Sequence, residues 1–117
     1  ASSLVGSEMC IRDSATAVQY NAGVIVFVVD NEMYGTIRMH QHKNYKGKYK
    51  HTGLINPDFN KLAVAMGGQG YTVEKTEDFM SIYDEAREWT NTNNLPSLLH
   101  IKTGSEMVLP GKRFSSL

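Results

Sequence analysis

The fold of this chain is decided by residues 24–29, which read Val-Ile-Val-Phe-Val-Val. A continuous run of β-branched and aromatic residues is typical of a strand in a parallel sheet, with helices covering both of its faces. Upstream, residues 15–20 have the pattern of the last turns of a helix, which Asn21 and Gly23 end. The sequence therefore predicts a helix that leads into a strand buried on both faces.

A second helix is predicted from residue 56 onward. Asn56 is the expected cap and Pro57 the first helical residue, a position that proline favours. Gly67-Gly68 ends the pattern as a helix C-terminus rather than as a dinucleotide-binding loop, because a strand follows and not a helix. The apolar residues recur at helical spacing and form one stripe: Phe59, Leu62, Ala63 and Met66.

The rest of the chain predicts strand, helix and strand in that order. Residues 71–74 form a short strand, Thr76 caps the next helix, and residues 93–96 break that helix before a strand over 97–101. The expected buried stripe of this helix is Phe79, Ile82, Tyr83 and Ala86, together with Trp89. We predict an α/β fold: a doubly wound, mostly parallel sheet with helices on both faces, truncated at its N-terminal side, with an irregular tail over Met107–Leu117.

The composition bounds the class of protein. A chain of 117 residues has room for one domain, and 41% hydrophobic with 21% charged residues is ordinary globular composition. Twelve basic and twelve acidic residues cancel, so no net field favours nucleic acid. No apolar run is long enough to cross a membrane. A single cysteine, Cys10, predicts a reducing, cytoplasmic compartment.

The residues with chemistry follow the first strand, where ligands dock in open parallel sheets. Residues 30–37 read Asp-Asn-Glu-Met-Tyr-Gly-Thr-Ile. Asn31 offers a neutral side-chain oxygen to a hard cation such as Mg²⁺, and the turn after it directs the main-chain carbonyl of Met33 to the same ion. The residues whose amides can open a helix and face phosphate oxygens are Gly35, Thr36 and Ile37.

These residues carry a resemblance to a known family. Val28–Gln41 resembles the second half of the thiamine diphosphate binding motif, which runs from Gly-Asp-Gly over some 25 to 30 residues to Asn-Asn. The likeness continues through Asn56–Phe59, Ala65–Gly68 and Val73–Phe79, and it covers the chain from Ala15 to about Lys102. It is closest to acetolactate-synthase-like enzymes and their benzoylformate-decarboxylase relatives.

The resemblance implies roles for individual residues. Asn31 would be the side-chain Mg²⁺ ligand and Met33 a main-chain ligand, while Asp30 replaces the first asparagine of the pair and would support the loop. The residues that would line the diphosphate are Tyr34, Gly35, Thr36 and Ile37. No catalytic acid, base or nucleophile is assigned in this chain, because the family's activating glutamate belongs to another domain, usually of a partner subunit.

The resemblance also implies an activity. The parent enzyme would be a lyase or transferase that decarboxylates or ligates 2-oxo acids with thiamine diphosphate and Mg²⁺, and it would be a homodimer or tetramer. This chain would need its remaining domains and a second subunit, so by itself it would be inactive. Neither the particular 2-oxo acid nor the acceptor follows from these residues.

The beginning of the chain has a different character. Leu4–Ser14 resembles the translation of a transposon-end sequencing adapter, so residues 1–14 are interpreted as non-native and 15–117 as a partial cofactor-binding domain. The alternative is a genuine exposed arm. Counting back 25 to 30 positions from Asn31 reaches Ala1–Gly6, which contains no aspartate. Without that anionic ligand we expect severely weakened Mg²⁺ binding.

A basic stretch leaves a second class of function open. Tyr45 and Tyr49 lie among its cations, a combination that occurs in nucleic-acid binding. A solvated connection near the active-site mouth or a subunit contact is the favoured interpretation, and the alternative is a non-catalytic α/β module that binds a protein or RNA. His40 and His42 lack an acidic or cysteine neighbour for a metal. The basic residues are Arg38, His40, His42, Lys43, Lys46, Lys48, Lys50 and His51.

Overall fold

A computed structural model describes residues 12–109 and 112–113. These residues form two compact units. The first unit contains the described residues up to Val29 together with Pro57–Lys102, and the second contains Asp30–Asn56 with the described residues after Lys102. Expectations about residues 1–11, 110–111 and 114–117 lie outside the described residues.

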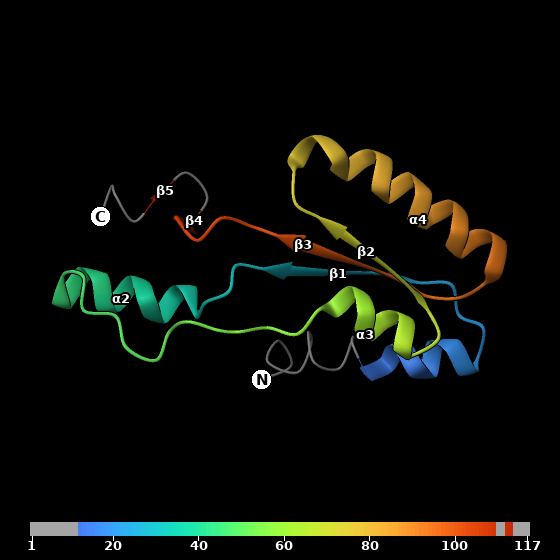
Figure 1. Ribbon diagram of the computed structural model, residues 1–117, viewed down its shortest axis with the longest axis horizontal. Helices are drawn as coiled ribbons and strands as arrows, with labels where there is room; N and C mark the ends of the chain where they lie inside the picture. The colour runs from blue at the N-terminus through green and yellow to red at the C-terminus, as the bar shows by residue number, and fades with distance from the viewer. Residues whose placement is uncertain (1–11, 110–111, 114–117) are drawn as a thin grey trace. The chain divides into compact units, whose positions relative to one another are not determined.

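The first unit is built on a three-stranded sheet with the order β1-β3-β2. The strands are β1 (Ile25–Asp30), β2 (Gln69–Val73) and β3 (Ser97–Lys102). β2 and β3 pair in parallel with Tyr71 opposite Leu99. The arrows of all three strands point the same way in Figure 1, so the sheet is parallel.

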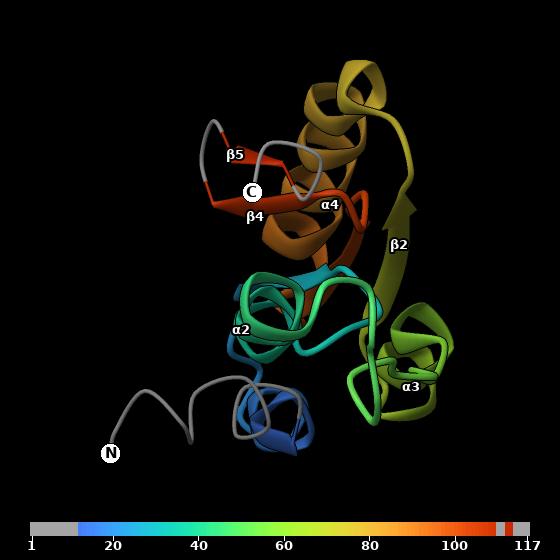
Figure 2. The same cartoon turned by 90° about the vertical axis from the view of Figure 1, so that its left-hand side faces the viewer.

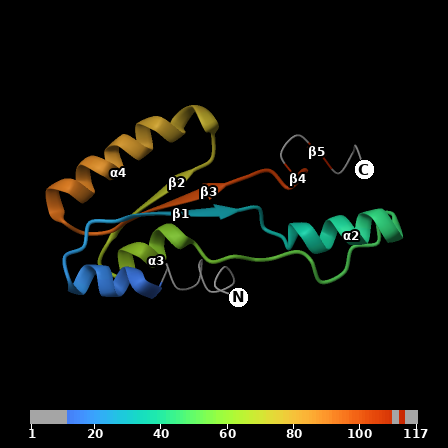
Figure 3. The same ribbon diagram turned by 180° about the vertical axis from the view of Figure 1, so that it is seen from behind.

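Helices cover both faces of this sheet. α4 (Phe79–Asn93) lies on one face, and α3 (Phe59–Ala65) lies on the other beside a helical segment over residues 12–19. The three layers are seen again after a quarter turn (Figure 2) and from behind (Figure 3). The predicted α/β doubly wound fold is therefore confirmed.

The core lies between the sheet and α4. Val73, Ala86 and Leu99 are buried, with Phe79, Ile82 and Tyr83 of α4 packed against them. The ring of Phe27 lies 6.2 Å from that of Phe79, between centroids. The stripe predicted for this helix is thus confirmed at Phe79, Ile82, Tyr83 and Ala86, of which Ala86 is fully buried and the three larger side chains are partly buried.

The prediction that the first strand is buried on both faces is wrong. Among the described strands β1 lies at an edge of the sheet, and the side chains of Phe27 and Val29 are 46% and 68% exposed. The central strand is β3, in which Leu98 and Leu99 are buried. A continuous apolar run is typical of a strand that is covered on both faces. Whether the strand is central or at an edge depends on which other strands pair with it.

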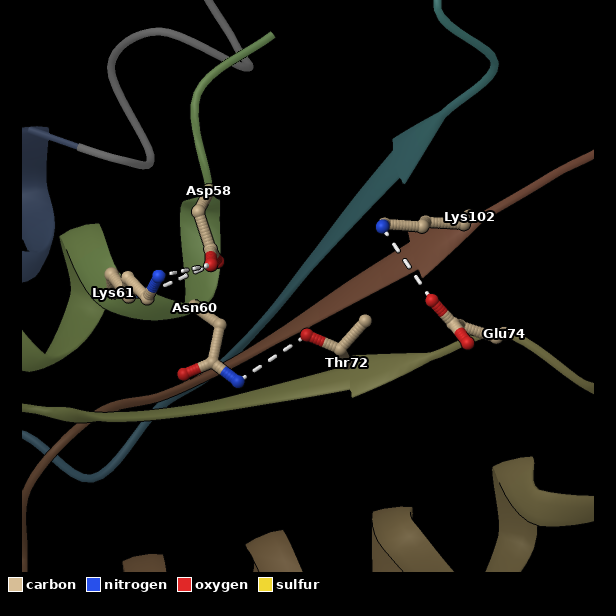
Figure 4. A network of polar contacts seen from close by, with 6 residues as sticks. All are labelled: Asp58, Asn60, Lys61, Thr72, Glu74 and Lys102. Atoms are coloured by element: carbon tan, nitrogen blue, oxygen red, sulfur yellow. Dashed lines mark hydrogen bonds and ion pairs between the residues drawn. The ribbon is translucent and has the colours of Figure 1, made fainter.

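The predicted start of α3 is also wrong. The cap is Asp58, whose Oδ1 accepts a hydrogen bond from the backbone N–H of Lys61 at 3.3 Å. This bond lowers the pKa of Asp58, and the Nζ of Lys61 lies 3.5 Å from Oδ2 (Figure 4). Asn56 lies two residues before this cap, and its Nδ2 donates to the Oδ1 of Asp30.

Polar contacts join the elements around β2. The Nδ2 of Asn60 on α3 donates to the Oγ1 of Thr72 at 3.3 Å, and the Nζ of Lys102 lies 3.5 Å from the Oε1 of Glu74 (Figure 4). The predicted helix break is confirmed, since Asn94 is left-handed with a φ of 53°. Thr76 is not the cap of α4: it begins a short 3₁₀ turn, η1 (Thr76–Asp78), that precedes the helix.

The second unit contains one helix and a small hairpin. α2 (Gly35–Tyr45) follows the end of β1 along the chain. β4 (Met107–Leu109) pairs antiparallel with β5 (Lys112–Arg113), so the tail expected to be irregular contains two short strands. Within the described ranges, the helices are too short or too polar to cross a membrane.

Candidate functional site

The predicted ligand residues lie in one turn of the second unit. The Oδ1 of Asn31 accepts a hydrogen bond from the backbone N–H of Met33 at 3.2 Å, closing a tight turn directly after β1. Glu32, between them, has a φ of 55° in the left-handed region that non-glycine residues seldom adopt. The turn is therefore a specifically held backbone conformation.

Asp30 supports this turn, as the sequence predicted. Its side chain is 5% exposed, and its Oδ1 accepts hydrogen bonds from the N–H of Glu32 at 2.9 Å and the Nδ2 of Asn56 at 2.7 Å. Its carbonyl oxygen accepts from the N–H of Thr103 at 2.8 Å. The sequence did not predict this contact of Asn56, because its local pattern indicates a helix cap.

The beginning of α2 presents free backbone donors. Tyr34 is its N-cap and makes no side-chain cap hydrogen bond, and the first turn contains no acidic residue. The first helical bond among the described contacts runs from the N–H of Arg38 to the carbonyl of Tyr34 at 2.9 Å. Helix geometry gives the first N–H groups no intrahelical acceptor, and the positive end of the helix dipole favours an anion there. These groups belong to Gly35, Thr36 and Ile37.

The side chains around this helix start differ in exposure. Met33 is 6% exposed, and its backbone forms an antiparallel bridge to Gly53. Tyr34 and Ile37 are 52% and 55% exposed. Large apolar side chains exposed beside free amides are typical of a surface that a ligand or partner covers.

The loop after α2 lies beside this helix and braces the turn (Figure 1). The N–H of Tyr34 donates to the carbonyl of Thr52 at 2.9 Å, and the N–H of Leu54 donates to the carbonyl of Glu32 at 2.8 Å. Gln41 of α2 holds the same loop: its Nε2 donates to the carbonyl of Lys50 at 2.9 Å. Its Oε1 accepts from the hydroxyl of Thr52 at 3.2 Å. No sequence signal pointed to Gln41 or Thr52.

The basic stretch is organised around Tyr49. The guanidinium of Arg38 lies 4.3 Å from the centre of the Tyr49 ring. The ring of His42 stacks on it at 5.9 Å, and His42 Nδ1 is hydrogen-bonded to the Tyr49 hydroxyl. This ring is engaged within the chain, which disfavours it as a base-stacking platform. In the described ranges, His40 and His42 are not part of a group of three metal-binding side chains.

The residues present fit one part of a metal–diphosphate ligand. Asn31 and the Met33 carbonyl are neutral oxygen donors of the kind Mg²⁺ accepts, and the α2 amides suit phosphate oxygens. A Cβ added to Gly35 would lie 3.2 Å from the Nδ2 of Asn31. The absence of a side chain at Gly35 therefore leaves space for the side-chain amide of Asn31. Among the described residues no cluster of acidic, histidine and cysteine side chains adds an anionic ligand. The described residues thus offer suitable donors for the phosphate groups, and they offer neutral but no clustered anionic ligands for the cation.

Comparison with known proteins identifies the family. The sequence profile described as "Thiamine pyrophosphate enzyme, C-terminal TPP binding domain" matches residues 6–101. The chain belongs to this family. Its cofactor is thus thiamine diphosphate, as predicted, whose usual companion is Mg²⁺. The match begins inside the segment interpreted as non-native, and that interpretation stays a prediction.

Relatives of this domain are acetolactate synthases. The mitochondrial catalytic subunit of Aspergillus candidus is 37% identical over 103 residues, which cover 87% of this chain and 14% of that protein. The corresponding Saccharomyces cerevisiae subunit is 34% identical over the same shares. The isozyme 3 large subunit of Escherichia coli is 31% identical over 88% of this chain and 18% of its own length. The chain thus spans under a fifth of these relatives.

Proposed function

We propose that this chain holds the diphosphate end of thiamine diphosphate and its Mg²⁺ in an acetolactate-synthase-like enzyme. The observation that carries the proposal is the turn at Asn31, which runs within a few residues into a helix start with free N–H groups. Neutral oxygens and helix-start amides together match a cation–diphosphate pair.

Each residue contributes binding rather than proton transfer. Asn31 would offer its side-chain oxygen to Mg²⁺ and Met33 its carbonyl, while Tyr34 and the first turn of α2 would line the diphosphate. When bound, the cofactor would supply stabilisation of the negative charge that develops on the carbonyl carbon of a 2-oxo acid as CO₂ leaves. The part of this chain is to bind and orient the phosphate end.

The parent enzyme is proposed to act on 2-oxo acids by decarboxylation or carboligation, as a lyase or transferase. The acetolactate synthase relatives support this class. The parent enzyme is also proposed to be a homodimer or tetramer. It is proposed to work in a reducing compartment such as the cytoplasm, which the single cysteine supports. Because no catalytic acid, base or nucleophile is assigned here, the chain by itself is expected to be inactive.

The proposal is tested by calorimetric titration of the chain with thiamine diphosphate, with and without Mg²⁺. Because the charged ligand of the motif is missing, a second version carries Leu4→Gly with Val5→Asp, which completes Gly-Asp-Gly with the existing Gly6. We expect weak Mg²⁺-dependent binding by the unaltered chain and at least tenfold tighter binding by this version.

Asn31→Ala in the completed version should abolish the Mg²⁺ dependence, and Asn44→Ala, at an exposed position of α2, is the matched control. Mg²⁺-independent binding, or binding unchanged by Asn31→Ala, would contradict the proposal. Salt-sensitive retention of RNA with no response to the cofactor would favour the interaction-module alternative instead.

A further inference from the structure

The hydrogen bond between Asp30 and Asn56 joins two positions 26 residues apart in the chain. We infer that Asn56 is a positioning residue for the ligand-bearing turn and acts through Asp30. This inference rests on the proposed function of that turn. The residue that connects the pair to the site is Asn31, which follows Asp30 directly.

One carboxylate oxygen carries the arrangement. The Oδ1 of Asp30 accepts both from the Asn56 amide at 2.7 Å and from the N–H of Glu32 at 2.9 Å. Asn56, which lies outside the turn, therefore holds the oxygen that in turn holds the backbone N–H of Glu32. Hydrogen bonds to a charged group in a buried position are about twice as strong as neutral ones, and Asp30 is 5% exposed.

Glu32 shows why the turn needs such support. Its left-handed φ of 55° is costly for a residue with a Cβ and persists only where surrounding contacts hold it. Its N–H is held by Asp30 and its carbonyl accepts from the N–H of Leu54 at 2.8 Å. If the bond from Glu32 to Asp30 is lost, the backbone between Asn31 and Met33 can relax. The side-chain oxygen of Asn31 and the carbonyl of Met33 then no longer keep the positions that the turn gives them.

Asn56 is suited to this task by its chemistry and its neighbour. An amide is a neutral donor that reaches a carboxylate without adding charge next to an anionic ligand. The proline that follows restricts the backbone of Asn56 to extended conformations, so less backbone freedom is lost when the bond forms. This accounts for an asparagine before a proline at a position where no helix begins.

Two substitutions test the inference in the full chain carrying Leu4→Gly and Val5→Asp. Asn56→Asp places two carboxylates together and should raise the dissociation constant for thiamine diphosphate with Mg²⁺ about tenfold or more. Asn56→Leu removes the donor at similar size without adding charge and should raise the dissociation constant by a smaller factor, about threefold or more. Asn44→Asp makes the same charge change at an exposed position of α2 and is the control.

A second measurement needs no cofactor. Hydrogen exchange at the amides of Glu32 and Leu54 should accelerate in Asn56→Asp and in Asn56→Leu more than exchange at the amides of β3 does. A role confined to general stability would accelerate exchange in β3 to the same extent.

The inference is overturned if Asn56→Asp binds and exchanges like the starting protein, or if exchange in β3 accelerates as much as exchange at Glu32 and Leu54. If the starting protein itself does not bind the cofactor, the proposed function fails. Exchange then decides the inference alone: selective acceleration at Glu32 and Leu54 keeps the positioning role, and uniform or absent acceleration removes it.

Discussion

Gly35 is the residue where the needs of a helix and of a ligand site conflict. It opens α2, where alanine would stabilise the helix by up to about 1 kcal/mol. A Cβ at this position would lie 3.2 Å from the Nδ2 of Asn31 and displace that side chain. We therefore expect Gly35→Ala to leave the thermal midpoint unchanged or higher while weakening cofactor binding at least fivefold by titration. Gly53→Ala, where a Cβ meets nothing within 4 Å, should change neither.

Asp58 gives α3 a dependence on pH. The hydrogen bond from the N–H of Lys61 lowers the pKa of Asp58 in the folded chain, so its charged form stabilises the helix at neutral pH. A lowered carboxyl pKa means that this stabilisation is complete above the unfolded pKa of about 4 and is lost as the pH falls below it. Denaturant unfolding should therefore separate the unaltered chain from Asp58→Ala at pH 7, and the difference should shrink as the pH falls through the folded pKa of Asp58. A difference that stays the same in acid would contradict this role.

At the scale of elements, Gln41 joins α2 to the loop that braces the ligand turn. Gln41→Met keeps the length of the side chain but removes the bonds to Lys50 and Thr52, and we expect a loss of about 1 kcal/mol in unfolding free energy. Amide exchange in residues 48–54 should accelerate more than exchange in β3. His40→Met, on an exposed position of the same helix, should cause neither change. Equal acceleration throughout the chain would show that Gln41 serves general stability only.

Most elements could be predicted from local pattern, and the errors at Asn56 and β1 share one physical cause. Apolar spacing located α3, α4 and β3, and it placed the ligand turn directly after β1. Both of these errors concern partners that are distant in sequence: Asn56 satisfies a capping pattern but donates to Asp30, 26 residues away. Likewise the brace at Gln41 depends on loop geometry, and strand position in a sheet depends on pairing. Local sequence contains neither kind of information.

At the scale of the whole molecule, the first unit leaves an apolar surface uncovered. An open hollow of about 970 Å³ is lined by the helical segment near residues 13–20 and by every residue of Val24–Val29. Val29 is 68% exposed on an edge strand, a position that invites pairing with another chain. We expect concentration-dependent self-association by analytical ultracentrifugation, which Val29→Lys should reduce.

Val64→Lys provides the comparison, because Val64 is 53% exposed but lies on α3 rather than on an edge strand. It should leave the association unchanged. A sharp thermal transition from a monodisperse monomer would contradict the expectation that this apolar surface drives association.

The central claim is that the turn at Asn31 and the start of α2 hold the phosphate end of the cofactor. Phosphorus NMR of thiamine diphosphate tests it most directly, with the chain carrying Leu4→Gly and Val5→Asp. We predict that both phosphorus resonances shift on binding only when Mg²⁺ is present, that Asn31→Ala removes the shift, and that thiamine without phosphates does not compete. Unshifted phosphorus resonances in a bound complex, or equal competition by thiamine, would contradict the account.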